Sequence, residues 1–389
     1  MSGSERAGSG AEDLAAWRHE FPILGSTNYL ISNSLGAMPR GAAAALEQYA
    51  RAWAKRGVRA WDEGWWEMPV AVGDMVAPII GAPTGTVTMH QSVTLAEAVV
   101  LSCFEPRGPR NKIVFEDGNF PSVQSLSGAQ PGLRVASVPV ERLVDAIDDQ
   151  TLLVPISHVL FKSSFVQDVP AIVEKAHRVG ALVVLDVYQS AGVLPLDVGA
   201  LGVDFAVGGC LKWLCGGPGN GFLYVRPDLA QLTPKLTGWM AHADPFRFEP
   251  PPIRYAEGPF RFLNGTPSIP CLYAAIEGLR IIREVGVARI REQSVRLTER
   301  LLRSIDERGF PSITPRDAAR RGGTVAVNPP DAEAISRRLL ERNFFIDYRP
   351  GAGIRISPHF YNTDDECDAI VAEIAALAAG RPSLRATRH

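Results

Sequence analysis

Short apolar runs alternate with amphipathic stretches through the middle of the chain. The runs are rich in β-branched and aromatic residues and are bounded by turn residues, which predicts strands. The next stretch, residues 169–180, repeats its apolar positions at helical spacing and ends at Gly180, which predicts a helix with a glycine cap. This alternation predicts a mainly parallel sheet with helices on both faces. The predicted strands are 112–116, 152–156, 181–185, 204–208 and 221–225.

The pattern changes after about residue 275. Residues 274–309 read as a long helical stretch, because apolar residues return every three or four positions. Short β-rich runs and two further helices follow, which predicts a small C-terminal α+β domain. The expected division is a disordered tail at 1–15, an N-terminal segment at 16–50 packing on the small domain, a large domain at 51–280, the small domain at 281–380 and a tail at 381–389.

Composition excludes several classes of function. The 389 residues include 40 Lys plus Arg and 42 Asp plus Glu, so the charge gives no support to binding of nucleic acid or a membrane surface. The N-terminus lacks a signal-peptide core, and no apolar stretch is long enough to cross a bilayer. The five cysteines are scattered, which predicts free thiols, no metal site and a cytoplasmic location.

The stretch 181–225 carries the strongest candidate chemistry. Asp186 ends an apolar strand, and Lys212 follows another strand beside a glycine-rich turn at 216–221. Taken singly, such an Asp is commonly a helix cap, such a Lys a solvated charge and such a turn a tight loop. Together, at the carboxyl edge of a sheet, they suit pyridoxal 5′-phosphate (PLP). The lysine would form a Schiff base, and the carboxylate would keep the pyridine nitrogen protonated.

Ordered motifs along nearly the whole chain resemble a known family. The sequence is similar to fold-type I PLP enzymes of the class V aminotransferase group, and within it to kynureninase. The resemblance implies a large domain with a mainly parallel sheet between helices, plus a small C-terminal domain. The motifs are NYLISNSLGAMPR (28–40), the segment 75–101, FEDGNFPSVQS (115–125), VDFAVGGCLKWLCGGPG (203–219), GWMAH (238–242) and FLNGTPSIP (262–270).

The resemblance assigns cofactor contacts within one subunit. Val93 and Thr94 would hold the phosphate in a turn that opens a helix, where the helix dipole favours an anion. Phe120 would stack on the pyridine ring. Asp186 would pair with the ring nitrogen, and Lys212 would form the Schiff base and then act as general base at the substrate Cα.

Further contacts implied by the resemblance involve the second subunit and the substrate. Trp239 and Thr266 resemble residues that approach the phosphate from the partner, which implies a homodimer with shared active sites. Ser163 matches a hydroxyl position near the cofactor. The substrate-binding candidates are Arg355, which would grip a carboxylate bidentately, and Asn33 and Ser34 of the N-terminal motif.

Several positions depart from the kynureninase pattern. Leu211 stands where kynureninases carry a tyrosine before the lysine, and Val123 replaces an aspartate. Gln189, expected to contact the cofactor, replaces a histidine, and Ile31-Ser32 replaces Asp-Gly. Tyr188 is a candidate for the missing phenol, although strand alternation can turn it away from the ring. These departures change which protons can be moved but leave the PLP chemistry in place.

We therefore expect a PLP-dependent enzyme that acts on an amino acid through a Schiff base and a Cα carbanion. The expected reaction is β-elimination or Cβ–Cγ cleavage by a kynureninase-like lyase or hydrolase that is not an authentic kynureninase. An aminotransferase or a decarboxylating deaminase is the alternative, and a non-catalytic PLP-binding protein is a remote one. A cysteine desulfurase is disfavoured, because RRGGTVAVN (320–328) contains no cysteine.

Overall fold

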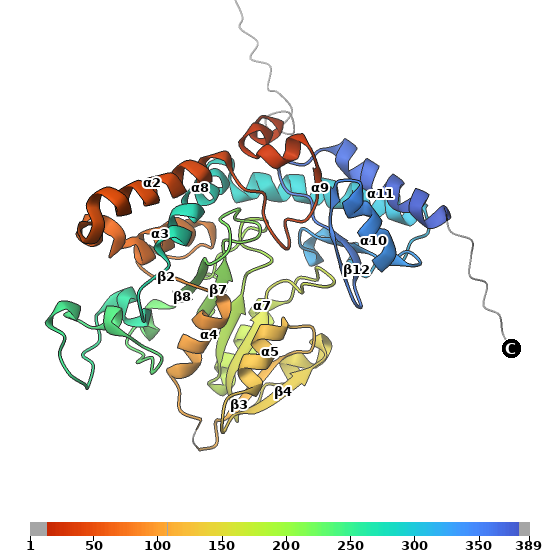
Figure 1. Cartoon of the computed structure of the whole chain (residues 1–389). Helices are drawn as coiled ribbons and strands as arrows, with labels where there is room; N and C mark the ends of the chain where they lie inside the picture. The colour runs from red at the N-terminus through yellow and green to blue at the C-terminus, as the bar shows by residue number, and fades with distance from the viewer. Residues whose placement is uncertain (1–13, 107, 381–389) are drawn as a thin grey trace, which may run out of the picture.

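The computed structural model describes residues 14–106 and 108–380 (Figure 1). The predicted tails therefore lie outside the described residues, apart from residues 14 and 15. Over the described residues, the main sheet has seven strands in the order β2-β8-β7-β6-β5-β3-β4. Its strands are β2 (Val87–His90), β3 (Lys112–Glu116), β4 (Arg134–Val138), β5 (Thr151–Ser157), β6 (Leu182–Asp186), β7 (Phe205–Gly209) and β8 (Gly221–Val225).

The sheet is mainly parallel, as the sequence predicts. Strands β7, β6, β5, β3 and β4 run parallel to one another, whereas β8 runs antiparallel to both β7 and β2. The five predicted strands are present with shifts of at most one residue. Strands β2 and β4 are additions that the apolar pattern did not predict.

Helices cover both faces of the sheet. Alternate residues of β7 point into separate cores, since Phe205 and Val207 pack with α4 while Ala206 packs with α3, α7 and α8. The predicted helix with its glycine cap is α7, which ends at Gly180 in a left-handed conformation. The helices of the large part are α2 (Arg40–Arg56), α3 (Met68–Val76), α4 (Val93–Ser102), α5 (Pro121–Gly128), α6 (Leu143–Ala146), α7 (Val169–Val179) and α8 (Ile269–Val285).

The C-terminal part forms a second core beside the main sheet (Figure 1). The predicted long helix at 274–309 is two helices, because Gly286 adopts a positive φ and separates α8 from α9. The described C-terminal residues contain an antiparallel sheet of order β11-β12-β9. The helices and strands of the C-terminal part are α9 (Val287–Glu307), β9 (Val325–Val327), α10 (Ala332–Glu341), β10 (Phe344–Phe345), β11 (Asp347–Arg349), β12 (Gly353–Ile356) and α11 (Asp364–Ala379).

The N-terminal segment joins the two cores. Strand β1 (Asn28–Tyr29) pairs with β10, and Leu30 is buried in the C-terminal core. By contrast, α2 packs along α8 of the large part. The proposed domain boundaries remain a prediction. No described helix is both long and apolar enough to span a bilayer.

Candidate active site

The topology brings the candidate residues to one edge of the sheet. Asp186 is the last residue of β6, and Lys212 follows the end of β7 by three residues. Because β2 and β7 are both antiparallel to β8, β2 also ends at this edge, where α4 begins with Val93. The carboxyl edge of a parallel sheet is the usual ligand site of α/β folds.

A cavity of about 330 Å³ opens at this edge. Its volume lies near the lower end of the ~300–1,000 Å³ typical of ligand sites. Asp186 and Lys212 share the cavity with Val93, Thr94, Phe120 and Gln189, so the structure brings together most of the predicted cofactor contacts. The complete lining is Gln91, Ser92, Val93, Thr94, Phe120, Ser122, Val123, Ser157, Val159, Phe161, Asp186, Tyr188, Gln189, Leu211, Lys212, Pro218, Gly219 and Asn220.

The Lys212 amine lies close to two aromatic side chains. Its Nζ is 4.2 Å from the centroid of the Tyr188 ring and 5.6 Å from that of Phe120. Burial lowers the pKa of Lys212 to about 8, while the Asp186 carboxylate opposes the fall. A lysine with a lowered pKa is more often the neutral amine at a given pH, and the neutral amine is the form that attacks a carbonyl.

Asp186 is a buried carboxylate fixed by the backbone. Its Oδ1 accepts a hydrogen bond of 2.8 Å from the Tyr188 N–H. Burial raises the pKa of Asp186, whereas this hydrogen bond and the positive charge of Lys212 act in the opposite direction. The pair thus offers an anchored acidic group and an amine within one cavity.

The start of α4 provides a place for an anion. Ser92 caps the helix through its Oγ, which accepts a hydrogen bond from the Leu95 N–H at 3.2 Å. The N–H groups of Val93 and Thr94 belong to the first turn and have no acceptor within the helix. Both residues line the cavity, so these N–H groups and the helix dipole suit a phosphate.

Three of the four departures from the kynureninase pattern, at Leu211, Val123 and Gln189, lie on the cavity wall, whereas Ile31-Ser32 does not line it. Leu211 and Val123 place apolar side chains there. Gln189 is fixed at both ends, since its Nε2 donates to the Asn33 carbonyl at 3.0 Å and its Oε1 accepts from Trp213 Nε1 at 3.1 Å. None of these three side chains can therefore act as an acid or a base in the cavity.

Arg355 does not line the cavity itself, but it is bonded to the backbone of Phe161, which does. It is only 3% exposed, its Nη1 donates to the Phe161 carbonyl at 2.8 Å, and its Nε and Nη2 bind the Asp347 carboxylate. A guanidinium has five N–H groups. One N–H on each terminal nitrogen thus has no partner among the described residues, and such a pair matches a carboxylate.

Other predicted residues do not reach this cavity. The Ser163 Oγ instead accepts a hydrogen bond from the Phe165 N–H, and the chain places Val159 and Phe161 on the wall. Asn33 and Ser34 do not line the cavity either. Asn33 contacts it only indirectly, through Gln189. The two residues expected from a second subunit, Trp239 and Thr266, are also outside this cavity, and both are accessible on the surface.

Gly36 fixes the N-terminal segment against the Lys212 loop. Its N–H donates to the Leu211 carbonyl at 2.8 Å, and a Cβ at this position would lie 2.1 Å from the Lys212 carbonyl oxygen. We therefore expect Gly36→Ala to lower the free energy of unfolding by ~1–3 kcal/mol through overpacking. Urea unfolding measures the change. Gly25→Ala is the control, because nothing lies within 4 Å of a Cβ there, and equal losses in both variants would contradict the prediction.

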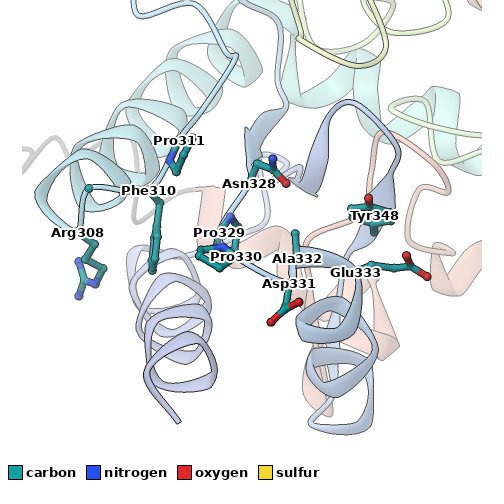
Figure 2. Close-up of a pocket in the computed structure, with 11 residues that line it drawn as sticks. Arg308, Phe310, Pro311, Asn328, Pro329, Pro330, Asp331, Ala332, Glu333 and Tyr348 are labelled. Atoms are coloured by element: carbon teal, nitrogen blue, oxygen red, sulfur yellow. The ribbon is translucent and has the colours of Figure 1, made fainter. Parts of the chain in front are cut away.

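A separate hollow of about 780 Å³ lies on the C-terminal part (Figure 2). It is formed by the end of α9, the start of α10 and β11, and it shares no residue with the Lys212 cavity. Among the described residues, none of its side chains is a buried polar group without a partner. It therefore gives no indication of a ligand. Its lining includes Arg308, Phe310, Pro311, Asn328, Pro329, Pro330, Asp331, Ala332, Glu333 and Tyr348.

Comparison with known proteins identifies the family. The sequence model described as Aminotransferase class-V matches residues 74–370. The chain belongs to the class V aminotransferase family. Among its relatives, a kynureninase from Pseudomonas fluorescens is 34% identical over 360 residues, covering 87% of this chain and 86% of the relative. A kynureninase from Burkholderia pseudomallei (strain 1106a) is 32% identical over 386 residues, covering 92% and 91%.

Solved structures share the fold of this class V protein. The apo cysteine desulfurase from Thermococcus onnurineus NA1 superposes with a TM-score of 0.82 at 22% identity, covering 98% of this chain and 100% of that chain. A mutant of C-DES with glycine covalently linked to its PLP cofactor superposes with a TM-score of 0.83 at 22% identity, covering 92% and 98%. These likenesses confirm PLP fold type I.

The class V family is PLP-dependent, and the residues of this cavity fit the cofactor. Asp186 offers a carboxylate for the ring nitrogen, Lys212 an amine for the aldehyde, and the start of α4 an anion site. When bound, PLP supplies an electron sink for negative charge at the substrate Cα. The protein is therefore a divergent, kynureninase-like PLP enzyme of the lyase, hydrolase or aminotransferase type.

Sequence reasoning missed the partner of Arg355. Asp347 lies directly opposite Arg355 in the antiparallel pair of β11 and β12. The signal was an acidic residue eight positions before the arginine, with a turn between two short strands. Val159 and Phe161 were missed as wall residues, because they follow β5 in an irregular segment whose side-chain directions no periodicity predicts.

Proposed function

We propose that this class V enzyme cleaves a bond at Cβ or Cγ of an amino-acid substrate, with β-elimination as the reaction that its residues suit best. β-Elimination needs the PLP electron sink, one base at Cα and a leaving group at Cβ. Lys212 is the base in this proposal, and Asp186 keeps the cofactor ring protonated. With one water, an amino acid bearing the leaving group X then yields HX, ammonium and pyruvate.

One observation carries this proposal. Lys212 and Asp186 share a cavity in which the side chains expected for kynurenine hydrolysis are replaced by Leu211, Val123 and a Gln189 that is hydrogen-bonded at both ends of its amide. Apolar walls favour a substrate side chain whose reaction needs no acid or base from the wall. None of the five cysteines lines the described cavity, so the proposal includes no sulfur transfer to a protein thiol.

A substrate panel tests the proposal. The PLP-loaded protein is mixed with β-substituted alanines, L-kynurenine and 3-hydroxykynurenine, and pyruvate, ammonium, anthranilates and alanine are measured. Pyruvate and ammonium in equal amounts support elimination. Rapid release of anthranilates with alanine identifies a true kynureninase, and keto acid without ammonium identifies a transaminase. Spectral change without any product on the panel identifies a PLP-binding protein without catalytic function.

Arg355→Lys tests how the substrate carboxylate is held. We expect the KM of an accepted amino acid to rise about 10- to 100-fold, since charged hydrogen bonds contribute ~1.5–3 kcal/mol. A lysine cannot hold Asp347 bidentately and also offer two parallel donors to the substrate. Arg349→Lys is the matched control, because Arg349 also pairs with Asp347, at 3.1 Å, but is 44% exposed. If both variants raise KM equally, the assignment to Arg355 is wrong.

The homodimer belongs to the same proposal. Trp239 forms an aromatic patch with the half-buried Trp66 and the exposed Phe246 and Phe248, with neighbouring ring centroids 5.0–6.4 Å apart. Such a patch on a protein surface favours association. In the proposed dimer, Trp239 and Thr266 approach the cavity of the partner subunit. Light scattering tests the assembly, which should have twice the chain mass of 42.1 kDa.

The free cysteines favour the proposed cytoplasmic location.

A further inference from the structure

Tyr188 presents the face of its ring, and not its hydroxyl, to Lys212. The Lys212 Nζ lies 4.2 Å from the ring centroid, well inside the ~6 Å limit of a cation–π contact. The tip of the ring rests over Gly209 of β7, where a Cβ would lie 2.6 Å from both Cζ and the hydroxyl oxygen. Glycine at 209 therefore makes room for the ring, while the hydrogen bond from the Tyr188 N–H to Asp186 fixes its backbone.

We propose that Tyr188 is a positioning residue whose ring face stabilises positive charge on the Lys212 nitrogen. In the cofactor-free protein that charge is the ammonium. Resting on the proposed function, the inference extends to the protonated Schiff base, because its nitrogen is the same Nζ. Tyr188 is therefore not a substitute for the tyrosine that kynureninases carry at the position of Leu211. Its contribution is the aromatic face, so phenylalanine should serve equally well.

Four charged side chains also act on the Lys212 ammonium. The Asp186 carboxylate favours the ammonium, and so does Asp347 to a smaller extent. Arg355 and Arg349 act against it, and each of them is bound to Asp347. The Tyr188 ring is the aromatic face nearest to the nitrogen, since Phe120 lies at 5.6 Å.

The hydroxyl of Tyr188 is a poor acid for the reaction. Burial raises the pKa of Tyr188 above its ordinary value, and the charges of Cys210 and Asp186 add to the rise. The hydroxyl also lies over Gly209, at the tip of a ring whose face contacts Lys212. A role through the face thus agrees with the geometry better than a role through the hydroxyl.

The test is the pH profile of Lys212 acylation in the cofactor-free protein. An amine-reactive acylating reagent labels the protein across a pH range that spans 8, and the labelled Lys212 peptide is quantified by mass spectrometry. We expect Tyr188→Phe to keep the wild-type midpoint. Tyr188→Leu, which keeps apolar bulk but loses the ring face, should lower the midpoint by roughly 0.5–1.5 pH units.

The sign of the shift decides between the roles. If the ring only excluded water, Tyr188→Leu would leave the midpoint unchanged or raise it, because any added solvation favours the ammonium. A shift in Tyr188→Phe as large as in Tyr188→Leu would overturn the inference in favour of the hydroxyl. Thermal unfolding of both variants verifies the fold, and Tyr188→Ile repeats the comparison if Tyr188→Leu unfolds.

A second readout uses the cofactor. In PLP-loaded protein, the pH midpoint of the visible absorption band should also fall in Tyr188→Leu and not in Tyr188→Phe. If PLP fails to bind, the proposed function fails while the acylation profile still reports on Tyr188. If PLP binds and neither midpoint falls in Tyr188→Leu, the inference fails while the proposed function stands.

Discussion

Replacing Lys212 by alanine is expected to abolish the covalent link to the cofactor and almost all turnover. Lys212 lies in the cavity with Asp186, and burial lowers its pKa to about 8, so a useful fraction is the neutral amine near neutral pH. Loss of the base at Cα alone should reduce kcat by about 10²–10⁴-fold. Borohydride reduction of the wild type, followed by peptide mass spectrometry, should place the cofactor on Lys212, and Lys212→Ala should show no such adduct.

The variant should still bind PLP without a covalent bond, because Asp186 and the start of α4 remain. Added methylamine should then restore part of the activity by supplying the missing amine. Lys175→Ala is the control, since Lys175 lies on α7 and does not line the cavity. Full activity and an unchanged adduct in Lys212→Ala would show that another lysine carries the cofactor.

The sequence predicted most of the parallel sheet but not the antiparallel direction of β8, which lies between β2 and β7. Buried runs such as β6 and β7 are continuous and apolar, and the helix between β5 and β6 forces a parallel crossover. Strand β8 has the same apolar pattern as its neighbours, yet it is antiparallel, and a short turn at 216–221 was the only hint. Strand β4 is largely exposed, so burial gave it no clear pattern.

The sequence predicted those site residues that are both chemically suited to the cofactor and placed at the end of a predicted strand. Asp186 and Lys212 follow strands whose ends meet at one sheet edge, so their proximity follows from topology. The direction of the Tyr188 ring does not follow, because the residue lies just beyond β6, where alternation ends. The proposed roles of Trp239 and Thr266 depend on a second chain, whose surface one sequence does not describe.

The hydrogen bonds of Gln189 show what the change from histidine does at this position. A glutamine for histidine at position 189 can look conservative, since both side chains form hydrogen bonds. Here both ends of Gln189 are bonded, which ties the cavity to Asn33 of the N-terminal segment and to Trp213. Trp213 in turn accepts a hydrogen bond at its carbonyl from His359 at 2.8 Å. Gln189 therefore belongs to a hydrogen-bonded network that includes Trp213, the residue next to Lys212.

Asp186→Asn is expected to lower kcat by at least about 10²-fold while leaving the fold intact, the scale seen when one electrostatic group is removed from a buried site. The amide keeps the volume and can still accept the Tyr188 N–H, but it has no charge to hold the ring nitrogen protonated. The Asp186 charge also raises the pKa of Lys212, so in the cofactor-free variant that pKa should fall below about 8. Steady-state kinetics with a substrate from the panel measure the change in kcat, and the acylation profile of Lys212 measures the change in its pKa.

Glu116→Gln is the matched control for Asp186→Asn. Glu116 is a fully buried carboxyl at the end of β3 that accepts the Ser157 N–H at 3.0 Å, but it does not line the cavity. If the loss depends on charge at the cofactor ring, Glu116→Gln should retain most of kcat and the Lys212 midpoint. Equal losses in both variants would mean that any buried carboxyl at this edge supports activity through packing. A fully active Asp186→Asn would remove Asp186 from the chemistry and leave Lys212 as the sole residue that the proposed reaction requires.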